Sequence, residues 1–517
     1  MDSPGRGTSV LASFPGFSPP REEAPNRASS DILSETMRRR RALILSAAIL
    51  AGVGAACAPP ATLGSGAYPA RSLAPAGAPP YRYEVAAGPG GQELAITVYL
   101  PAGTTHLRAA RAMLPFLRDV SMSLNEGVWL PLTTADGGFD LAGCGSAPCR
   151  ARYRVLLGEA ARTLDDRDTA LVHRGAVLAP SSTWLLKPAR PLSDDRFRLH
   201  VTTSPGVNYV NGLFPAKDAP DIQEGRIADL EGSPYAAFGL ARAQRVVFAG
   251  GEITVAMSDG APALGREAIE SWIEVRARAV ADYYGRFPVP HAALLVLFEQ
   301  DHDLAGSTMG SGGASVMVSL DEKSTPAALD DDWILVHELV HVAFPNVGKA
   351  WVEEGLASYV EPLIRVRAGL ISSDHLYRDL LDGLPQGQPQ PGDRGLDHTD
   401  TWGRRYWGGA LFWFLADVAI RKSTGNAHSL DGALRRIVAQ GGNVSVSWTV
   451  DRTLEEGDRD AGGTVLRDLR HKLGDAAVTT DLEALWNELG VHLVNGKVIY
   501  DDTAPLAAIR KSIAAPR

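Results

Sequence analysis

Two histidines and a glutamate are spaced along this chain as a metal-binding helix would space them. The segment is His337-Glu338-Leu339-Val340-His341. Residues four apart lie on the same face of an α-helix, so the imidazoles of His337 and His341 can reach one ion. Glu338 lies about 100° around the helix, outside the ligand set. A carboxylate in that place can act as a general base for a water molecule bound beside it.

A candidate third ligand follows in Trp351-Val352-Glu353-Glu354-Gly355. Pro345-Asn346 and Gly348 end the histidine helix, and a second helical pattern then begins. A reversal this short allows a glutamate early in the second helix to return to the metal. Adjacent helical residues point about 100° apart, so only one of Glu353 and Glu354 faces the ion. The spacing alone does not say which one.

The residues around the histidines predict a buried helix. Asp330, Asp331 and Asp332 precede it, where acidic side chains cap free N–H groups and favour the helix dipole. Apolar residues then occupy nearly every face, so two buried histidines need a partner. The alternative is a core helix whose histidines bond to backbone atoms and whose Glu338 is solvated. The apolar setting and the second helix favour the metal.

These motifs resemble those of the gluzincin metallopeptidases. His337-Glu338-x-x-His341, followed by Trp-Val-Glu-Glu-Gly-Leu-Ala-Ser-Tyr at 351–359, is similar to the glycyl aminopeptidase family and its relative aminopeptidase N. The resemblance implies that the third ligand is Glu354, the glutamate before glycine. It also implies one Zn²⁺ per chain, a thermolysin-like catalytic fold, and a peptide or protein substrate.

A second match to these families is Tyr406-Trp407-Gly408-Gly409-Ala410-Leu411. It is similar to their tyrosine-x-x-glycine-alanine-leucine helix, in which the tyrosine hydrogen-bonds the oxyanion of the tetrahedral intermediate. The resemblance therefore implies that Tyr406 is an oxyanion donor. Without the resemblance, Tyr406 would be interpreted as a half-buried aromatic residue before an apolar helix.

A third match is the glycine-rich run at residues 310–318. Related enzymes have a glycine-rich edge strand there, and this strand pairs with the substrate backbone. The resemblance implies substrate binding by Gly312, Gly313 and Ala314, because glycines allow close approach of another main chain. A flexible loop is the alternative interpretation.

Two departures from aminopeptidase N leave the type of peptidase open. This chain has fewer residues between the second histidine and the glutamate ligand. Aminopeptidase N also carries a glutamate in its glycine-containing strand to bind the free α-amine, whereas residues 306–318 include no acidic side chain. Glu299, Asp301 and Asp303 precede that strand and could substitute. Aminopeptidase and endopeptidase activity therefore both remain possible.

The N-terminal region predicts export. Four arginines at 38–41 precede an apolar run, 42–53, that is too short to span a bilayer comfortably. Cys57 follows Ala-Ala and resembles the lipidated cysteine of bacterial lipoproteins. We expect a signal peptide over residues 37–57 and a periplasmic or membrane-anchored protein of a bacterial-type envelope. Ordinary signal cleavage near this point is the alternative.

The segments on either side of the signal peptide have low-complexity compositions. Residues 1–36 are polar and rich in Pro, Gly and Ser, so we expect translation to start at Met37. A genuine disordered tail is the alternative. Residues 58–80 are rich in Pro, Ala and Gly, which is typical of a tether between an anchor and a folded part.

Cysteine usage is consistent with an oxidising compartment. The chain has three cysteines, and lipidation of Cys57 would leave Cys144 and Cys149. These two lie in Cys-Gly-Ser-Ala-Pro-Cys and can close a short loop as a disulfide. A metal pair is less favoured, because no nearby histidine or third cysteine completes a shell.

Length and composition predict a multidomain α+β protein. The chain has 517 residues, 45% hydrophobic and 21% charged, which is enough for at least two cores. Residues 81–262 predict a β-sandwich-like N-terminal domain, as is usual for the aminopeptidase N type. Residues 263–430 predict the mostly helical gluzincin catalytic domain, with 431–517 as its helical C-terminal part. The predicted strands are 94–100, 152–157, 196–201, 245–249 and 292–298, and the predicted helices include 266–284, 430–438 and 482–489.

The overall charge and the motifs narrow the function to two classes. The net charge is −9 and no basic stripe with interleaved aromatic residues occurs, so we exclude nucleic acid as a partner. The first class is a zinc metallopeptidase in which Glu338 is the general base. The second is a non-catalytic envelope lipoprotein of the same fold that binds peptides or cell-surface components. Intact ligands and base argue against the second class.

Overall fold

The computed structural model describes residues 80–124, 127–301 and 304–516. These residues all belong to one compact unit. The predicted tail 1–36, the signal peptide with Cys57, and the tether residues 58–79 lie outside the described residues, so those predictions stay predictions. Among the described helices, none is both long enough and apolar enough to cross a membrane.

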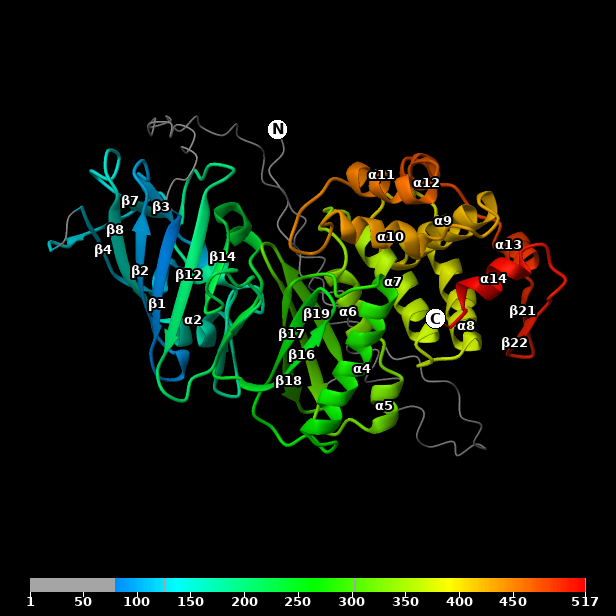
Figure 1. Cartoon of the computed structure of the whole chain (residues 1–517), viewed down its shortest axis with the longest axis horizontal. Helices are drawn as coiled ribbons and strands as arrows, with labels where there is room; N and C mark the ends of the chain where they lie inside the picture. Colours follow the sequence, from blue (N-terminus) through cyan, green and yellow to red (C-terminus); the bar gives the residue numbers. More distant parts are fainter. Residues whose placement is uncertain (1–79, 125–126, 302–303, 517) are drawn as a thin grey trace. The chain divides into compact units, whose positions relative to one another are not determined.

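The N-terminal part of the described chain contains a seven-stranded sheet with the strand order β14-β12-β1-β2-β8-β4-β5 (Figure 1). Strands β1, β2 and β8 alternate buried residues with more exposed ones, which is the pattern of a sheet with one face on a core and one in water. In β1, for example, Tyr83 and Val85 are buried whereas Arg82 and Ala86 are exposed. The strands are β1 (Tyr81–Ala87), β2 (Leu94–Leu100), β4 (Leu117–Ser123), β5 (Leu130–Pro131), β8 (Cys149–Val155), β12 (Arg196–Thr203) and β14 (Ile222–Arg226).

Two four-stranded sheets share the core of the seven-stranded sheet. Leu107 of one and Phe238 of the other belong to the same hydrophobic cluster as Tyr83. A disulfide joins Cys144 to Cys149 at the start of β8, with their Cα atoms 5.6 Å apart. The first sheet has β11 (Lys187–Pro188), β3 (His106–Arg108), β7 (Gly138–Asp140) and β6 (Thr134–Ala135), and the second has β13 (Tyr209–Asn211), β15 (Ala236–Phe238), β10 (Ala176–Leu178) and β9 (Leu171–His173). Short helices between these strands are η1 (Pro89–Gly91), η2 (Arg111–Phe116), α2 (Leu157–Leu164), α3 (Ser181–Trp184) and η3 (Ile227–Gly232).

A five-stranded sheet, ordered β16-β17-β18-β20-β19, supports the candidate site. Its central strand β18 is apolar almost throughout, as expected for a strand covered on both faces. β19 lies at one edge and runs antiparallel to β20. β16 and β17 precede the predicted boundary at residue 262, so the sheet that includes β18 to β20 already begins at Ala241. The strands are β16 (Ala241–Phe248), β17 (Gly251–Met257), β18 (His291–Glu299), β19 (Ala305–Gly310) and β20 (Ala314–Asp321).

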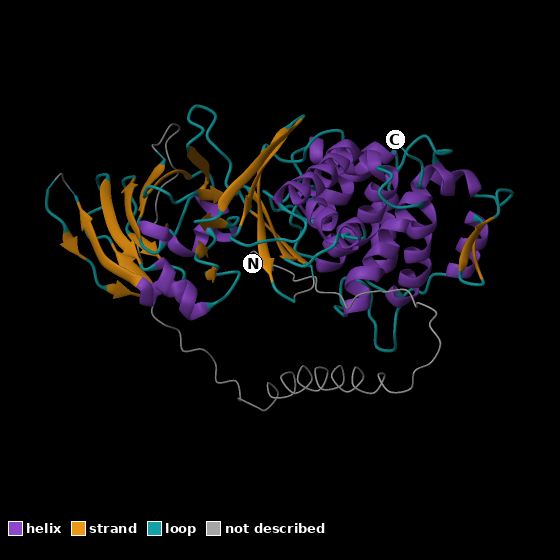
Figure 2. Ribbon diagram, turned by 90° about the horizontal axis from the view of Figure 1, so that it is seen from below, coloured by secondary structure: helices purple, strands orange, loops and turns teal. Residues whose placement is uncertain are grey.

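Helices follow the five-stranded sheet and make up most of the C-terminal half (Figure 2). Apolar residues of α4, α6, α7 and α9 form one continuous core with β17, β18 and β20. The helices are α4 (Arg266–Tyr284), α5 (Pro326–Asp330), α6 (Ile334–Val342), α7 (Ala350–Arg367), α8 (Ser373–Gly383), η4 (Leu384–Gly387), η5 (Arg404–Gly408), α9 (Gly409–Ser423), α10 (Leu430–Ala439), α11 (Val450–Ala461), α12 (Val465–Gly474), α13 (Leu482–Leu489) and α14 (Ala507–Ile513). A hairpin of β21 (Val491–Val494) and β22 (Lys497–Tyr500) lies between the last two.

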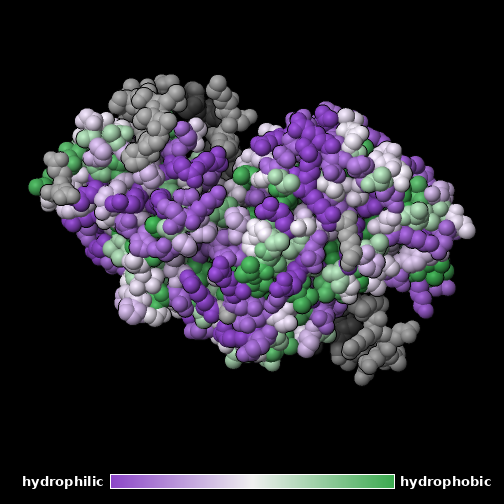
Figure 3. Space-filling view, in the orientation of Figure 1, coloured by the Kyte–Doolittle hydropathy of each residue, from purple (hydrophilic) through white to green (hydrophobic). Residues whose placement is uncertain are grey.

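The mixture of strands and helices confirms the predicted mixed fold class. Helices at 266–284 and 482–489 and the strand at 94–100 have the predicted bounds. The strand predicted at 152–157 is shifted: β8 ends at Val155, and Leu157 already starts α2. On the face shown in Figure 3, hydrophilic side chains predominate and hydrophobic ones form scattered patches.

Candidate active site

The first turn of α6 is capped by one of the three predicted aspartates. The Asp332 carboxylate accepts hydrogen bonds from the N–H groups of Ile334 (2.8 Å) and Leu335 (3.4 Å). The prediction was wrong for Asp330, which belongs to α5, and for Asp331, which ends that helix. Because α5 ends before α6 begins, only Asp332 of the three lies next to the free N–H groups of α6.

Three ligand atoms converge where α6 meets α7. Nε2 of His337 lies 3.3 Å from Nε2 of His341 and 3.3 Å from Oε2 of Glu354. The third side of this triangle, from His341 Nε2 to Glu354 Oε2, is 3.5 Å. Tetrahedral zinc with bonds of about 2.0–2.1 Å to nitrogen would hold its ligand atoms about 3.3–3.4 Å apart. The donor types and their separations therefore fit Zn²⁺.

Electrostatics hold the Glu354 carboxylate in its charged form. Burial opposes its charge, but His341 and His337 lower the pKa of Glu354 well below its ordinary value. Burial likewise opposes protonation of His341, yet the Glu354 carboxylate raises the pKa of His341 to about 9. A positive charge at this position is therefore strongly favoured, which is the electrostatic demand that a metal ion would satisfy.

The neighbouring Glu353 binds backbone N–H groups and is not a possible metal ligand. Its Oε1 accepts hydrogen bonds from the backbone N–H groups of Val347 (2.7 Å) and Gly348 (2.9 Å). These residues form the turn between α6 and α7, so Glu353 ties the turn to the helix that carries Glu354. The structure thus distinguishes the two glutamates. Glu354 lies with His337 and His341 in the group of possible metal ligands, and Glu353 holds the turn between α6 and α7.

A distant segment, residues 443–448, supports the same turn from outside. The Asn346 N–H donates to Val446 O, and the Trp448 N–H donates to Asn346 O, both at 3.0 Å. Val444 N–H caps the end of α6 through the carbonyl of Val342 (3.2 Å). Sequence reasoning missed this segment, because no local pattern shows which distant loop will pair with a turn. It accounts for how a short α6–α7 connection is held in place.

Glu338 lies against the edge strand β19. Its side chain is buried, and the Thr308 hydroxyl donates to its Oε2 at 2.7 Å. Burial raises the pKa of Glu338 above its ordinary value, although both histidines and the Thr308 hydrogen bond oppose this. A carboxylate with a raised pKa beside the possible metal ligands is suited to take up and release a proton.

Tyr406 lies in a π-helical turn, Arg404–Gly408, at the start of α9. Burial raises its pKa, and the negative charges of Glu354 and Glu338 raise it further. The phenol therefore stays protonated. Such turns are frequent at functional sites. The turn that carries Tyr406 packs against α7, the helix of Glu354.

Two glycines allow α7 and α9 to approach closely beside the ligand Glu354. A Cβ atom on Gly355 would lie 2.3 Å from Gly409 Cα, and one on Gly409 would lie 2.0 Å from the Trp351 carbonyl oxygen. Any side chain at either position would force the helices apart. The glycines that follow Glu354 and Tyr406 in the two motifs are therefore explained by the distance between the helix backbones.

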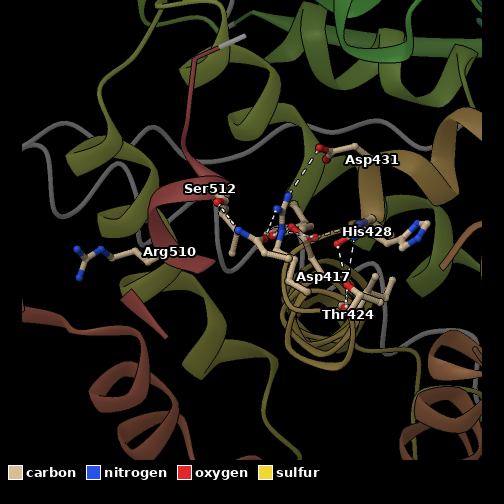
Figure 4. A network of polar contacts seen from close by, with 12 residues as sticks. Asp417, Thr424, His428, Asp431, Arg510 and Ser512 are labelled. Atoms are coloured by element: carbon tan, nitrogen blue, oxygen red, sulfur yellow. Dashed lines mark hydrogen bonds and ion pairs between the residues drawn. The ribbon is translucent and has the colours of Figure 1, made fainter. Parts of the chain in front are cut away.

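A buried polar network is built around Asp417 of α9 and Asp431 of α10 (Figure 4), and α7 also contributes to it. Tyr359 of α7 donates to Asp417 Oδ2 of α9 (3.1 Å), and Arg367 donates to Asp431 Oδ2 of α10 (2.6 Å). The N–H of Leu430 donates to Asp417 Oδ1 at 3.0 Å. Removing one partner of such a network leaves a buried charge uncompensated, so the network opposes displacement of these helices.

The predicted substrate-binding residues lie in a turn and at the start of an inner strand. Gly312 and Gly313 lie in the turn between β19 and β20, and Ala314 is the first residue of β20, an inner strand. Their main chain is already paired: Gly312 N–H donates to Ser445 O (2.9 Å), and Ala314 N–H donates to Gly212 O (2.8 Å). Gly313 bridges to Leu213. The edge next to α6 is instead β19.

The acidic residues suggested as amine-binding substitutes are engaged elsewhere. Glu299 ends β18 and lies 3.7 Å from His173. Asp301 pairs with Lys323. Asp303 lies outside the described residues. Neither Glu299 nor Asp301 belongs to the group of possible metal ligands formed by His337, His341 and Glu354.

Comparison with known proteins gives matches in structure. No protein-family model matches the sequence, and no curated protein does either. An aminopeptidase N family protein from Idiomarina loihiensis superposes with a TM-score of 0.59 at 13% identity, over 80% of this chain and 78% of that chain. An M1 zinc metallopeptidase from Deinococcus radiodurans gives a TM-score of 0.49 at 15% identity, over 78% of this chain and 94% of that chain.

The first of these likenesses shows the fold. The chain has the gluzincin fold of aminopeptidase N-like metallopeptidases, as the motifs around His337 and Tyr406 predict. What the chain does with this fold is argued below from its own residues.

Proposed function

We propose that this protein is a zinc-dependent peptidase of the aminopeptidase-like type. The observation that carries the proposal is the triangle of His337, His341 and Glu354, at zinc-ligand separations, with the buried carboxylate of Glu338 on the same helix. A relic that only bound peptides would have no chemical reason to keep three ligands and a base together. The likeness to an aminopeptidase N family protein supports a peptidase.

The chain's own residues divide the work of peptide hydrolysis. His337, His341 and Glu354 would hold the ion, which when bound acidifies water and polarises the substrate carbonyl. Glu338 takes a proton from the attacking water and delivers it to the leaving amine. Tyr406 donates a hydrogen bond to the developing oxyanion. The main chain of β19, at the sheet edge beside α6, offers a strand against which an extended peptide can lie.

Loss of the Tyr406 hydroxyl should slow the reaction without loosening substrate binding. Tyr406→Phe is expected to lower kcat by roughly 10²-fold or more, the cost of removing one oxyanion donor, and to leave KM nearly unchanged. Steady-state kinetics on a peptide substrate measure both constants. An unchanged kcat would remove Tyr406 from the mechanism.

One experiment tests the function directly. Full-length zinc-loaded protein is incubated with paired peptides that differ only in a free or an acetylated N-terminus, with and without a chelator. We expect hydrolysis that the chelator abolishes and zinc restores, with the free N-terminus preferred. Cleavage of the acetylated peptides as readily as of the free ones would reassign the enzyme as an endopeptidase. No cleavage by stoichiometrically zinc-loaded protein would favour the non-catalytic alternative.

We also propose that the enzyme acts outside the cytoplasm. The basic region before an apolar run supports export, and Cys57 after two alanines supports lipid attachment at that residue. The disulfide between Cys144 and Cys149 agrees with an oxidising compartment. Labelling with a radioactive fatty acid, compared between the natural chain and Cys57→Ala, distinguishes lipid attachment from ordinary signal cleavage.

A further inference from the structure

The edge strand β19 touches the zinc helix through two residues that point to the same face. Gly306 and Thr308 are two apart, so both lie on the side of the strand that faces α6. Thr308 reaches Glu338 through its hydroxyl. Gly306 lies opposite the Glu338 side chain with no side chain of its own. Two residues on the same face of β19, Gly306 and Thr308, therefore lie against the proposed base.

We propose that Thr308 is a positioning residue that orients Glu338 for proton transfer. The proposal rests on the proposed function, in which Glu338 is the general base. Nothing in the motifs that define the metal site includes Thr308. It acts on the reaction only through the carboxylate that it holds.

The hydrogen-bond geometry shows how Thr308 holds the carboxylate. Its Oγ1 lies 2.7 Å from Glu338 Oε2 and 3.0 Å from the Glu338 carbonyl oxygen. A hydroxyl has one proton, and the shorter, charge-assisted bond to the carboxylate is the stronger of the two. One carboxylate oxygen is thus bonded to the sheet edge. The other keeps its lone pairs for the proton of the attacking water.

Gly306 explains why the carboxylate comes so close to the strand. A Cβ atom at this position would lie 2.5 Å from Glu338 Cγ and 2.8 Å from Glu338 Oε1. It would also lie 2.7 Å from Ile334 Cγ2, so the side chains of Glu338 and Ile334 would have to move away from the strand. Glycine at 306 thus lets α6 approach until the Thr308 hydroxyl reaches Oε2.

The neighbouring Ser307 provides a matched control. It points to the opposite face of β19, where its hydroxyl lies 3.2 Å from the Tyr235 hydroxyl. Ser307 is buried, as is the carboxylate that Thr308 contacts. Removing either hydroxyl deletes one hydrogen bond from the same strand. Only the change at Thr308 alters the surroundings of Glu338.

The test compares Thr308→Val, Thr308→Ser and Ser307→Ala in the full-length zinc-loaded protein. A hydrogen bond to a charged group corresponds to about a ten- to hundredfold effect, so Thr308→Val should lower kcat by that factor. KM and zinc content should stay unchanged. Thr308→Ser restores the hydroxyl and should recover most of the loss. Ser307→Ala should leave kcat close to that of the natural protein.

Two further measurements separate positioning from a merely structural effect. Because Thr308 acts through Glu338, Thr308→Val should cost nothing further in a Glu338→Gln background. Crystal structures of the metal-free proteins should show the Glu338 carboxylate rotated away from β19 in Thr308→Val and unmoved in Ser307→Ala. An unchanged kcat in Thr308→Val, a full additional loss in the double variant, or an unmoved carboxylate would each overturn the proposal.

The crystallographic comparison also keeps the two proposals apart. If the natural protein shows no zinc-dependent peptide hydrolysis, the proposed function fails. The orientation of Glu338 in the metal-free Thr308→Val crystal still decides whether Thr308 positions this side chain.

Discussion

Replacing Glu338 by Gln should leave a folded, zinc-loaded protein that hydrolyses peptides roughly 10²–10⁴-fold more slowly. The amide keeps the size of the side chain and still accepts the hydrogen bond from Thr308, so packing against Gly306 survives. It cannot take a proton from the attacking water. Since Glu338 is not one of the clustered ligands, the metal content should not change.

Kinetics and elemental analysis on the same preparation test this prediction. Glu353→Gln is the natural control, because it makes the same chemical change at another buried glutamate near the site. Its amide oxygen still accepts the N–H groups of Val347 and Gly348, so its activity should be largely preserved. Turnover by Glu338→Gln close to that of the natural protein would refute the assignment of the base.

Replacing Glu354 by Ala should abolish stoichiometric zinc binding. The change removes one of three ligands and leaves the imidazoles of His337 and His341 without the carboxylate that makes a cation favourable there. Catalysis should disappear together with the metal. Thermal unfolding of the metal-free variant should resemble that of metal-free natural protein, since neither gains stability from a bound ion.

The adjacent Glu353 offers a comparison on the same turn of the same helix. Glu353→Ala frees the connection between α6 and α7 but keeps every ligand, so it should bind zinc about 10- to 100-fold more weakly, as is typical when a supporting partner is lost. Competition with a chromogenic chelator measures both affinities. Stoichiometric zinc in Glu354→Ala would contradict the assignment of Glu354 as a ligand. Complete loss of zinc in Glu353→Ala, with zinc retained in Glu354→Ala, would identify Glu353 as the ligand instead.

Local spacing predicted the part of the site that one helix presents. His337 and His341 are four residues apart, so any α-helix brings them together, and the geometry of Glu338 follows from the same periodicity. Glu354 needed a second helix to fold back, and its preference over Glu353 came from a family resemblance. The structure adds a physical reason, because the Glu353 carboxylate accepts hydrogen bonds from the turn between α6 and α7.

Contacts between distant parts of the chain escaped prediction. The family resemblance placed an edge strand at residues 310–318, yet Gly312 and Gly313 lie in a turn whose main chain pairs with Ser445 and Leu213. Which strand lies at the edge depends on that pairing, which no local pattern encodes. Thr308 was missed for the same reason. A single threonine in a strand carries no signal until the helix beneath it is known.

The segment 443–448, which braces the turn between α6 and α7, has a consequence for how the candidate site folds. Val446 and Trp448 bond to Asn346, and Arg367 of α7 donates to the carbonyl of Ile513. The ligand helices are therefore completed by residues that leave the ribosome long after the ligands themselves. A nascent chain that has just exposed His337, His341 and Glu354 lacks the contacts that fix their spacing. The spacing of the three ligand atoms therefore depends on contacts that can form only after residues 443–448 have been synthesised.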